Sequence, residues 1–200
     1  VAGKCTTDTI SAAGPWLKYK GHLPNISANT LNTATNAETN QVNSALDLDG
    51  SEHSISDLAQ LWKDRRQEWL LVAEHNYGEG SAREHAALQP RYLGCRVVLT
   101  KSFARIHETN LKKQGVVPLT FAREDDYLRL GAGDEISTVG LYDMLRNGGR
   151  GDVHLRVRKA RPGPDSQPGD EFLIPTLHTI TEDQAGFILA GSALNMLSRR

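Results

Sequence analysis

The sequence predicts an α/β fold, and two patterns lead to that prediction. Between residues 69 and 121, short apolar runs alternate with helix-like segments, as strands and crossover helices do in a parallel sheet. Beyond residue 127 the chain changes to strand-like runs that partly alternate between apolar and polar residues. With 200 residues, of which 38% are hydrophobic, the chain can bury one sizeable core. We therefore expect one domain over residues 1–200.

The first third of the chain carries weak signals. Residues 1–8 read as an irregular entry or the end of a linker, and residues 25–43 are rich in Asn, Thr and Ala. We expect the second of these stretches to be a surface excursion with a short helical piece. Residues 56–67 are predicted to be helical, with Ser56 as the cap and an apolar face at helical spacing.

The pattern of apolar runs predicts the limits of each strand and helix after residue 69. Strands are expected at 69–73, 96–100 and 116–121, and helices at 83–88 and 104–113. The later strands are expected at 135–140, 153–159 and 172–179, with a short helix at 141–145 and a turn-rich loop at 161–169. A last helix is predicted over 181–197, beginning with a capping box between Thr181 and Gln184.

A glycine-rich turn between a predicted strand and a predicted helix is the strongest local signal for chemistry. Residues 76–85 read NYGEGSAREH. Glycines let backbone approach a ligand closely, and the helix start presents N–H groups with partial positive charge, which favours an anion. Ser81 and Arg83 stand at the mouth of this turn. However, Ser81 and Glu84 also fit a capping box, and the local pattern alone does not decide between the two interpretations.

Four motifs give the chain a resemblance to a known family. They are residues 5–18 (CTTDTISAAGPWLK), 76–90, 101–115 (KSFARIHETNLKKQG) and 190–195 (AGSALN). Together they resemble the C-terminal, swivelling domain of aconitase, and the third is similar to the mitochondrial type. The resemblance runs from residue 4 to about residue 195, with divergent stretches at 32–49 and 159–169.

The resemblance implies a three-layer β/β/α fold and roles for individual residues. In this family the first serine of the loop moves a proton at a substrate carbon, which falls on Ser81. The arginine two positions on binds a substrate carboxylate, which falls on Arg83. An active-site aspartate in the opening motif falls on Asp8, although without the resemblance the pattern favours a turn or N-cap aspartate there. The family's [4Fe–4S] cluster is held by other domains, and this chain is expected to bind no metal.

Three positions depart from the family pattern. Ala82 stands where a second loop serine is usual, and Lys20 stands where an arginine contacts a substrate carboxylate. Thr9 replaces a histidine after the opening aspartate. A lysine keeps the charge but loses the bidentate fork of arginine. We expect Lys20, Ala82 and Arg83 to line the substrate site, and the departures to alter substrate preference or weaken activity.

Composition and charge limit the classes of partner and the cellular compartment that we expect. The net charge of −1 gives no electrostatic footprint for nucleic acid, and no apolar run approaches the length of a membrane span. Residues 101–115 are basic in part, but Glu108 and the lack of interleaved aromatics favour a solvated or packed helix. Two isolated cysteines, Cys5 and Cys95, fit a reducing compartment and are too few for an iron–sulfur cluster. The seven histidines are scattered, without paired ligand spacing.

The resemblance implies that the chain is part of a longer hydro-lyase that interconverts citrate and isocitrate through cis-aconitate. Its expected partners are a tricarboxylic acid and the cluster-bearing N-terminal domains of the same enzyme. We expect a monomer in the mitochondrial matrix, and an isolated domain that is inactive. Two alternatives remain: a dehydratase acting on homocitrate, one methylene longer, in lysine biosynthesis, or a non-catalytic relative that acts as a binding module.

Overall fold

The computed structural model describes residues 1–81 and 83–198. The helices are α1 (Thr7–Ile10), α2 (Leu23–Ser27), α3 (Ile55–Asp64), α4 (His85–Tyr92), α5 (Arg105–Lys113), α6 (Leu141–Arg146), α7 (Glu182–Ala190) and α8 (Ala193–Ser198), with 3-10 helices at Gly14–Tyr19 and Glu124–Arg129. The strands are β1 (Ala45–Leu46), β2 (Glu52–His53), β3 (Trp69–Ala73), β4 (Cys95–Thr100), β5 (Val117–Phe121), β6 (Glu135–Val139), β7 (Val153–Arg158) and β8 (Glu171–Leu177).

Six of the strands form one mixed sheet in the order β3-β4-β5-β8-β7-β6. The first three are parallel, with Val98 of β4 opposite both Leu71 of β3 and Pro118 of β5. The remaining pairs are antiparallel. The parallel part arises because α4 and α5 carry the chain back between successive strands, as crossover connections must. The predicted strands of both halves are confirmed to within one or two residues.

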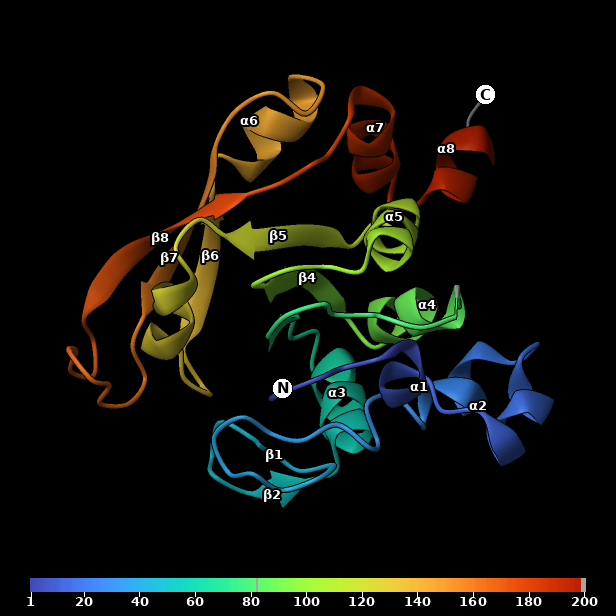
Figure 1. Cartoon of the computed structure of the whole chain (residues 1–200), viewed down its shortest axis with the longest axis horizontal. Helices are drawn as coiled ribbons and strands as arrows, with labels where there is room; N and C mark the ends of the chain where they lie inside the picture. Colours follow the sequence, from blue (N-terminus) through green and yellow to red (C-terminus); the bar gives the residue numbers. More distant parts are fainter. Residues whose placement is uncertain (82, 199–200) are drawn as a thin grey trace.

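The parallel strands β4 and β5 are buried on both faces, and β3 is buried on one face and half-buried on the other, so the fold has three layers. In β4, Val98 belongs to the same buried cluster as Ala86 of α4 and Leu111 of α5, whereas Leu99 belongs to the cluster that contains Leu155 of β7. Successive side chains of a strand point to opposite faces, so the helices cover one face and the antiparallel strands curve over the other. Figure 1 shows this arrangement, with α4 and α5 on one side of the molecule and β6, β7 and β8 on the other. The predicted β/β/α fold is confirmed.

The limits of α3, of α4 and of the last predicted helix differ from the prediction. Ser54, not Ser56, caps α3, since its hydroxyl accepts from the Asp57 N–H at 3.2 Å. The last predicted helix is divided in two, because Gly191 has φ +90° and closes α7. The predicted capping box of Thr181 and Gln184 is present. No helix among the described residues has the length and apolar character needed to cross a membrane.

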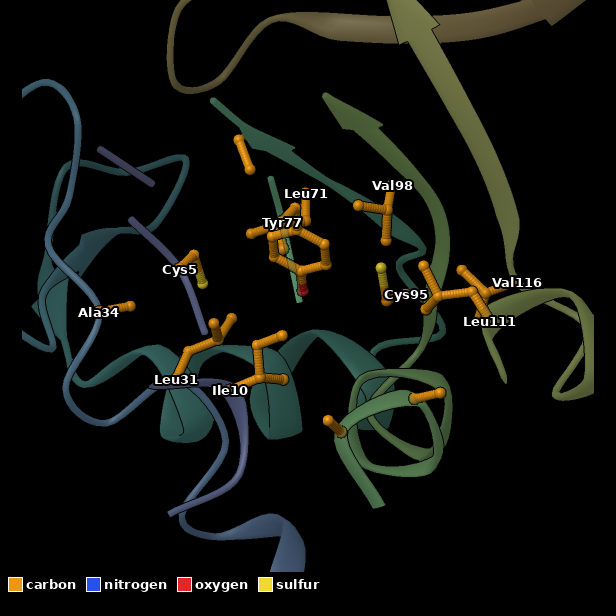
Figure 2. Packing of buried hydrophobic residues seen from close by; sticks show 13 residues of the cluster. Cys5, Ile10, Leu31, Ala34, Leu71, Tyr77, Cys95, Val98, Leu111 and Val116 are labelled. Atoms are coloured by element: carbon orange, nitrogen blue, oxygen red, sulfur yellow. The ribbon is translucent and has the colours of Figure 1, made fainter. Parts of the chain in front are cut away.

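The stretch 25–43 is a surface excursion only over residues 37–42, which are exposed, and α2 supplies the predicted short helical piece. Ile26, Leu31 and Ala34 are buried, and Leu31 and Ala34 join the core that lies against β3 and α4 (Figure 2). Turns separate these apolar anchors, and polar side chains satisfy the turn backbone, as when Asn29 Nδ2 donates to the Ala12 carbonyl at 3.0 Å. The periodicity of a helix or strand is therefore missing although the segment is well packed.

Candidate active site

Three segments run side by side where β3 and β4 end. The turn after β3 joins the segment after β4, because the Tyr77 N–H donates to the Ser102 carbonyl at 3.0 Å. On its other side the turn joins the chain's opening segment: the Gly78 N–H donates to the Cys5 carbonyl at 2.8 Å, and the Thr7 N–H donates to the Glu79 carbonyl at 2.9 Å. The carboxyl ends of parallel strands are the usual ligand-binding edge of an α/β sheet.

The opening segment is irregular over residues 1–5, as predicted, but it is packed against the turn. Cys5 is buried, and Thr6 caps α1 with a complete capping box in which Thr9 is the return partner. The Thr6 N–H donates to the Thr9 hydroxyl at 3.2 Å. Thr9, one of the three departures from the family pattern, thus completes the start of the helix on which Asp8 lies.

Asp8 and Arg83, far apart in the sequence, meet at this edge. The Arg83 guanidinium forms an ion pair with the Asp8 carboxylate through Nη1, which also donates to the Ser11 carbonyl at 3.2 Å. The Asp8 side chain is 66% exposed and that of Arg83 is 29% exposed. Two of the predicted site residues are therefore brought together at a solvent-accessible position.

Ser81 lies on the same turn, but it does not cap α4. The helix begins at His85 with Glu84 in the N-cap position and without a side-chain cap. Glu84 instead accepts from Gln114 Nε2 at 2.7 Å, so the predicted capping box is wrong. Ser81 is exposed, four residues before the helix. Ala82, the neighbouring predicted site residue, lies outside the described residues.

Fewer backbone N–H groups of the turn are free to bind an anion than the sequence pattern suggests. The Gly78 N–H is bonded to the Cys5 carbonyl, and the Glu79 N–H donates to the Asn76 carbonyl at 3.2 Å. These two N–H groups hold the turn in place and do not face a ligand. Stabilisation of an anion at Ser81 would depend on the chain beyond Glu79 and on the nearby Arg83 charge.

Lys20 approaches the start of α4 through a histidine that the sequence analysis did not single out. His85 Nε2 is 3.0 Å from the Lys20 carbonyl, so the Nε2 nitrogen carries the hydrogen. Lys20 is exposed at the end of the 3-10 helix Gly14–Tyr19. The signal that points to His85 is its place on the first turn of α4, directly after Arg83 and Glu84.

The two cysteines do not fit as ligands of an iron–sulfur cluster. Cys5 and Cys95 are free and buried, and burial raises the pKa of each thiol to about 12. Metal ligation requires the thiolate, which this burial disfavours. Within residues 1–81 and 83–198, no group of three His, Cys, Asp or Glu side chains is placed to hold a metal ion.

Comparison with known families shows which family the chain belongs to. The model of the aconitase C-terminal domain matches residues 1–124, which is more than half of the chain. The chain belongs to the aconitase C-terminal domain family. The predicted resemblance is thereby confirmed.

Relatives of this family match the whole chain. A putative mitochondrial aconitate hydratase of Emericella nidulans is 66% identical over 200 residues, covering 100% of this chain and 24% of the relative. A mitochondrial homocitrate dehydratase of Saccharomyces cerevisiae is 56% identical over 197 residues, covering 98% of this chain and 24% of the relative. The chain thus spans about a quarter of the length of these curated relatives.

A solved structure supports the fold independently. The crystal structure of 3-isopropylmalate dehydratase from Methanocaldococcus jannaschii superposes with a TM-score of 0.54 at 18% identity. The match covers 100% of this aconitase C-terminal domain and 90% of that chain. At this level of identity the similarity shows a shared fold.

Proposed function

We propose that this chain is the C-terminal domain of a longer, multidomain hydro-lyase that isomerises citrate to isocitrate through cis-aconitate. The observation that carries the proposal is the meeting of Asp8, Arg83 and the Ser81 turn at the carboxyl ends of β3 and β4. Membership of the aconitase family and relatives named aconitate hydratase support it. The names of these relatives also support a mitochondrial location.

Ser81 is the proposed proton-transfer group. Its hydroxyl would return a proton to, or as the alkoxide remove one from, the substrate carbon next to a carboxylate. An unaided serine is a poor base, so its anion needs fixed positive charge nearby. Two features support this role: Ser81 is exposed at the strand end, and the turn below it is held by hydrogen bonds on both sides.

Arg83 is the proposed carboxylate-binding residue, with Asp8 as the group that holds it. Among the described residues, the contacts of the guanidinium with Asp8 and Ser11 both use Nη1. The Nε–Nη2 edge can then bind a carboxylate by two parallel hydrogen bonds. Asp8 limits the rotamers of the arginine, so less side-chain entropy is lost when substrate binds.

We expect the 200-residue chain alone to be inactive. Its residues do not fit as cluster ligands, and it spans about a quarter of its curated relatives. The test is to purify the chain, reconstitute it with iron and sulfide, and follow cis-aconitate formation by ultraviolet absorbance, beside the full-length enzyme under the same conditions. Turnover by the isolated chain would contradict the expectation.

A second candidate substrate is homocitrate, and the departures at Lys20 and Ala82 favour it. A lysine in place of arginine loses a bidentate contact, which costs about 1–3 kcal/mol of binding to the usual substrate. A longer acid can recover part of that loss by placing its carboxylate nearer the Lys20 ammonium. The 56% identical homocitrate dehydratase also supports this candidate.

Restoring the family residues should shift the preference toward citrate. In the full-length enzyme, Lys20→Arg combined with Ala82→Ser should raise kcat/KM for citrate relative to homocitrate by about 10-fold, the equivalent of one charge-assisted hydrogen bond. The measurement is the ratio of the two kcat/KM values. Lys18→Arg, a neighbouring change on the same 3-10 helix, is the control and should leave the ratio unaltered. If the double variant also leaves the ratio unaltered, these two positions do not determine substrate choice.

A further inference from the structure

A buried histidine lies directly under the turn that carries Ser81. His107 of α5 is 2% exposed, and its side chain occupies the space next to Gly78. A Cβ atom on residue 78 would come within 2.2 Å of His107 Cγ and Cδ2 and within 2.5 Å of its Cβ. Gly78 also has φ +82°, a conformation that side-chain-bearing residues rarely adopt. Glycine at this position and the ring beneath it are therefore matched in shape.

The contacts of the His107 ring with the described residues are packing contacts. Neither ring nitrogen of His107 has a hydrogen-bond partner among the described residues. Burial lowers the pKa of His107 to about 4, so the imidazole is neutral near neutral pH. Its face meets the ring of Tyr77 at a centroid distance of 5.2 Å and an angle of 63°.

Tyr77 extends this support into the core. It is fully buried and lies between Cys5 and Cys95, as Figure 2 shows. The T-shaped contacts of Tyr77 with both Phe103 and His107 link the turn to the segment after β4 and to α5. Aromatic pairs of this geometry hold their partners in a defined orientation. The turn therefore rests on a layer of rings and not on a flexible loop.

The position of Gly78 determines where Asp8 and Ser81 lie. Its N–H donates to the Cys5 carbonyl, and the next residue, Glu79, accepts from the Thr7 N–H. Thr7 begins α1, the helix that carries Asp8, whereas Ser81 follows the turn directly. A shift of Gly78 would therefore move Asp8 and Ser81 relative to each other.

We propose that His107 is a positioning residue that fixes the Gly78 turn, and through it the relative placement of Ser81 and Asp8. The activity part of its test rests on the proposed function. A displacement of about 1 Å in a catalytic group can cost about 10²-fold in rate, so a packing residue beneath the turn can affect turnover without touching substrate. The role needs a flat ring at position 107 and no Cβ at position 78.

The test changes side-chain size at positions 78 and 107 in the full-length enzyme, singly and together. Gly78→Ala should lower kcat by about 10²-fold through the clash, and His107→Ala should lower it by about 10-fold by removing the support. The double variant Gly78→Ala with His107→Ala should have a kcat about 10-fold higher than that of Gly78→Ala alone, because removing the ring removes the clash. The effects of substitutions at two residues in contact are then not additive. His107→Phe keeps a flat ring and should stay within about 3-fold of the wild type, with KM little changed in all variants.

Gly133→Ala is the matched control. Gly133 has φ +86°, but its Cβ direction meets only Ala160 Cβ at 3.6 Å, so the change adds backbone strain without a clash. It should lower the melting temperature and leave kcat unaltered. Additive effects in the double variant, or a His107→Phe enzyme as slow as His107→Ala, would overturn the positioning role.

Hydrogen exchange separates this inference from the proposed function. Amides of Gly78 and Thr7 should exchange faster in His107→Ala than in His107→Phe, whatever the substrate. A wild-type enzyme that turns over neither citrate nor homocitrate would contradict the proposed function, and the exchange comparison would still test His107. Equal exchange in the two variants would overturn the inference even in an active enzyme.

Discussion

Ser81→Ala in the full-length enzyme should lower kcat by at least about 10²-fold, the scale that general acid–base catalysis supplies. The reason is that alanine cannot take or return the proton at the substrate carbon. KM should change much less, because the carboxylate contacts assigned to Arg83 and Lys20 remain. The measurement is steady-state kinetics with both citrate and homocitrate, so that the result does not depend on which acid is preferred.

The structure makes this experiment easy to interpret. Ser81 is exposed and does not cap α4, so its replacement should leave the melting temperature within about 1 °C, whereas loss of a cap costs about 1 kcal/mol. Ser137→Ala, at an exposed position of β6, is the matched control and should retain full kcat. Near-normal kcat in Ser81→Ala would remove the serine from the chemistry.

Arg83→Gln should lower kcat/KM by about 10²-fold or more, because two charge-assisted hydrogen bonds to a carboxylate contribute about 3 kcal/mol. Arg83→Lys should recover only part of the loss, since the ammonium keeps the charge without the fork. The change should appear in kcat/KM for every substrate that presents the carboxylate. Asp8→Asn should give a smaller loss, because it loosens the arginine without removing it.

Stability measurements distinguish this role from a structural ion pair. The Asp8 side chain is largely exposed, and exposed ion pairs contribute about 1 kcal/mol or less to the free energy of unfolding. Arg83→Gln should therefore reduce activity strongly while the melting temperature changes little. Arg96→Gln is the matched control, because Arg96 donates to Glu68 at 2.6 Å in another exposed pair. An equal loss of kcat/KM in the control would contradict the assignment.

The parallel half of the fold could be predicted from the sequence, for a physical reason. β4 and β5 are buried on both faces, and β3 is buried on one face and half-buried on the other, so their apolar runs are continuous and their limits are visible. α5 was equally clear, although its predicted solvated face contains the buried His107 and Lys112. Lys112 pairs with Glu108, one turn earlier on α5, at 3.2 Å, and it donates to the Thr179 hydroxyl at 2.7 Å. The first partner is local, whereas the second lies far along the chain and leaves no local signal.

The candidate site was only partly visible for the same reason. The glycine turn and its serine are local features, and the family resemblance supplied Asp8 and Arg83. The contact between His85 and Lys20, and the match between His107 and Gly78, join segments that are distant in sequence. The start of α4 could not be predicted either, because Glu84 bonds to Gln114 instead of returning to Ser81.

The most direct test of the central claim is the side-by-side measurement of kcat/KM for citrate and homocitrate with the full-length enzyme. The proposed function predicts turnover of at least one of the two acids, with citrate preferred. A preference for homocitrate would contradict the citrate assignment and support the second candidate, in which Lys20 and Ala82 determine the choice of acid. Turnover of neither acid by enzyme with an intact cluster would contradict the hydro-lyase assignment altogether and favour a non-catalytic binding module.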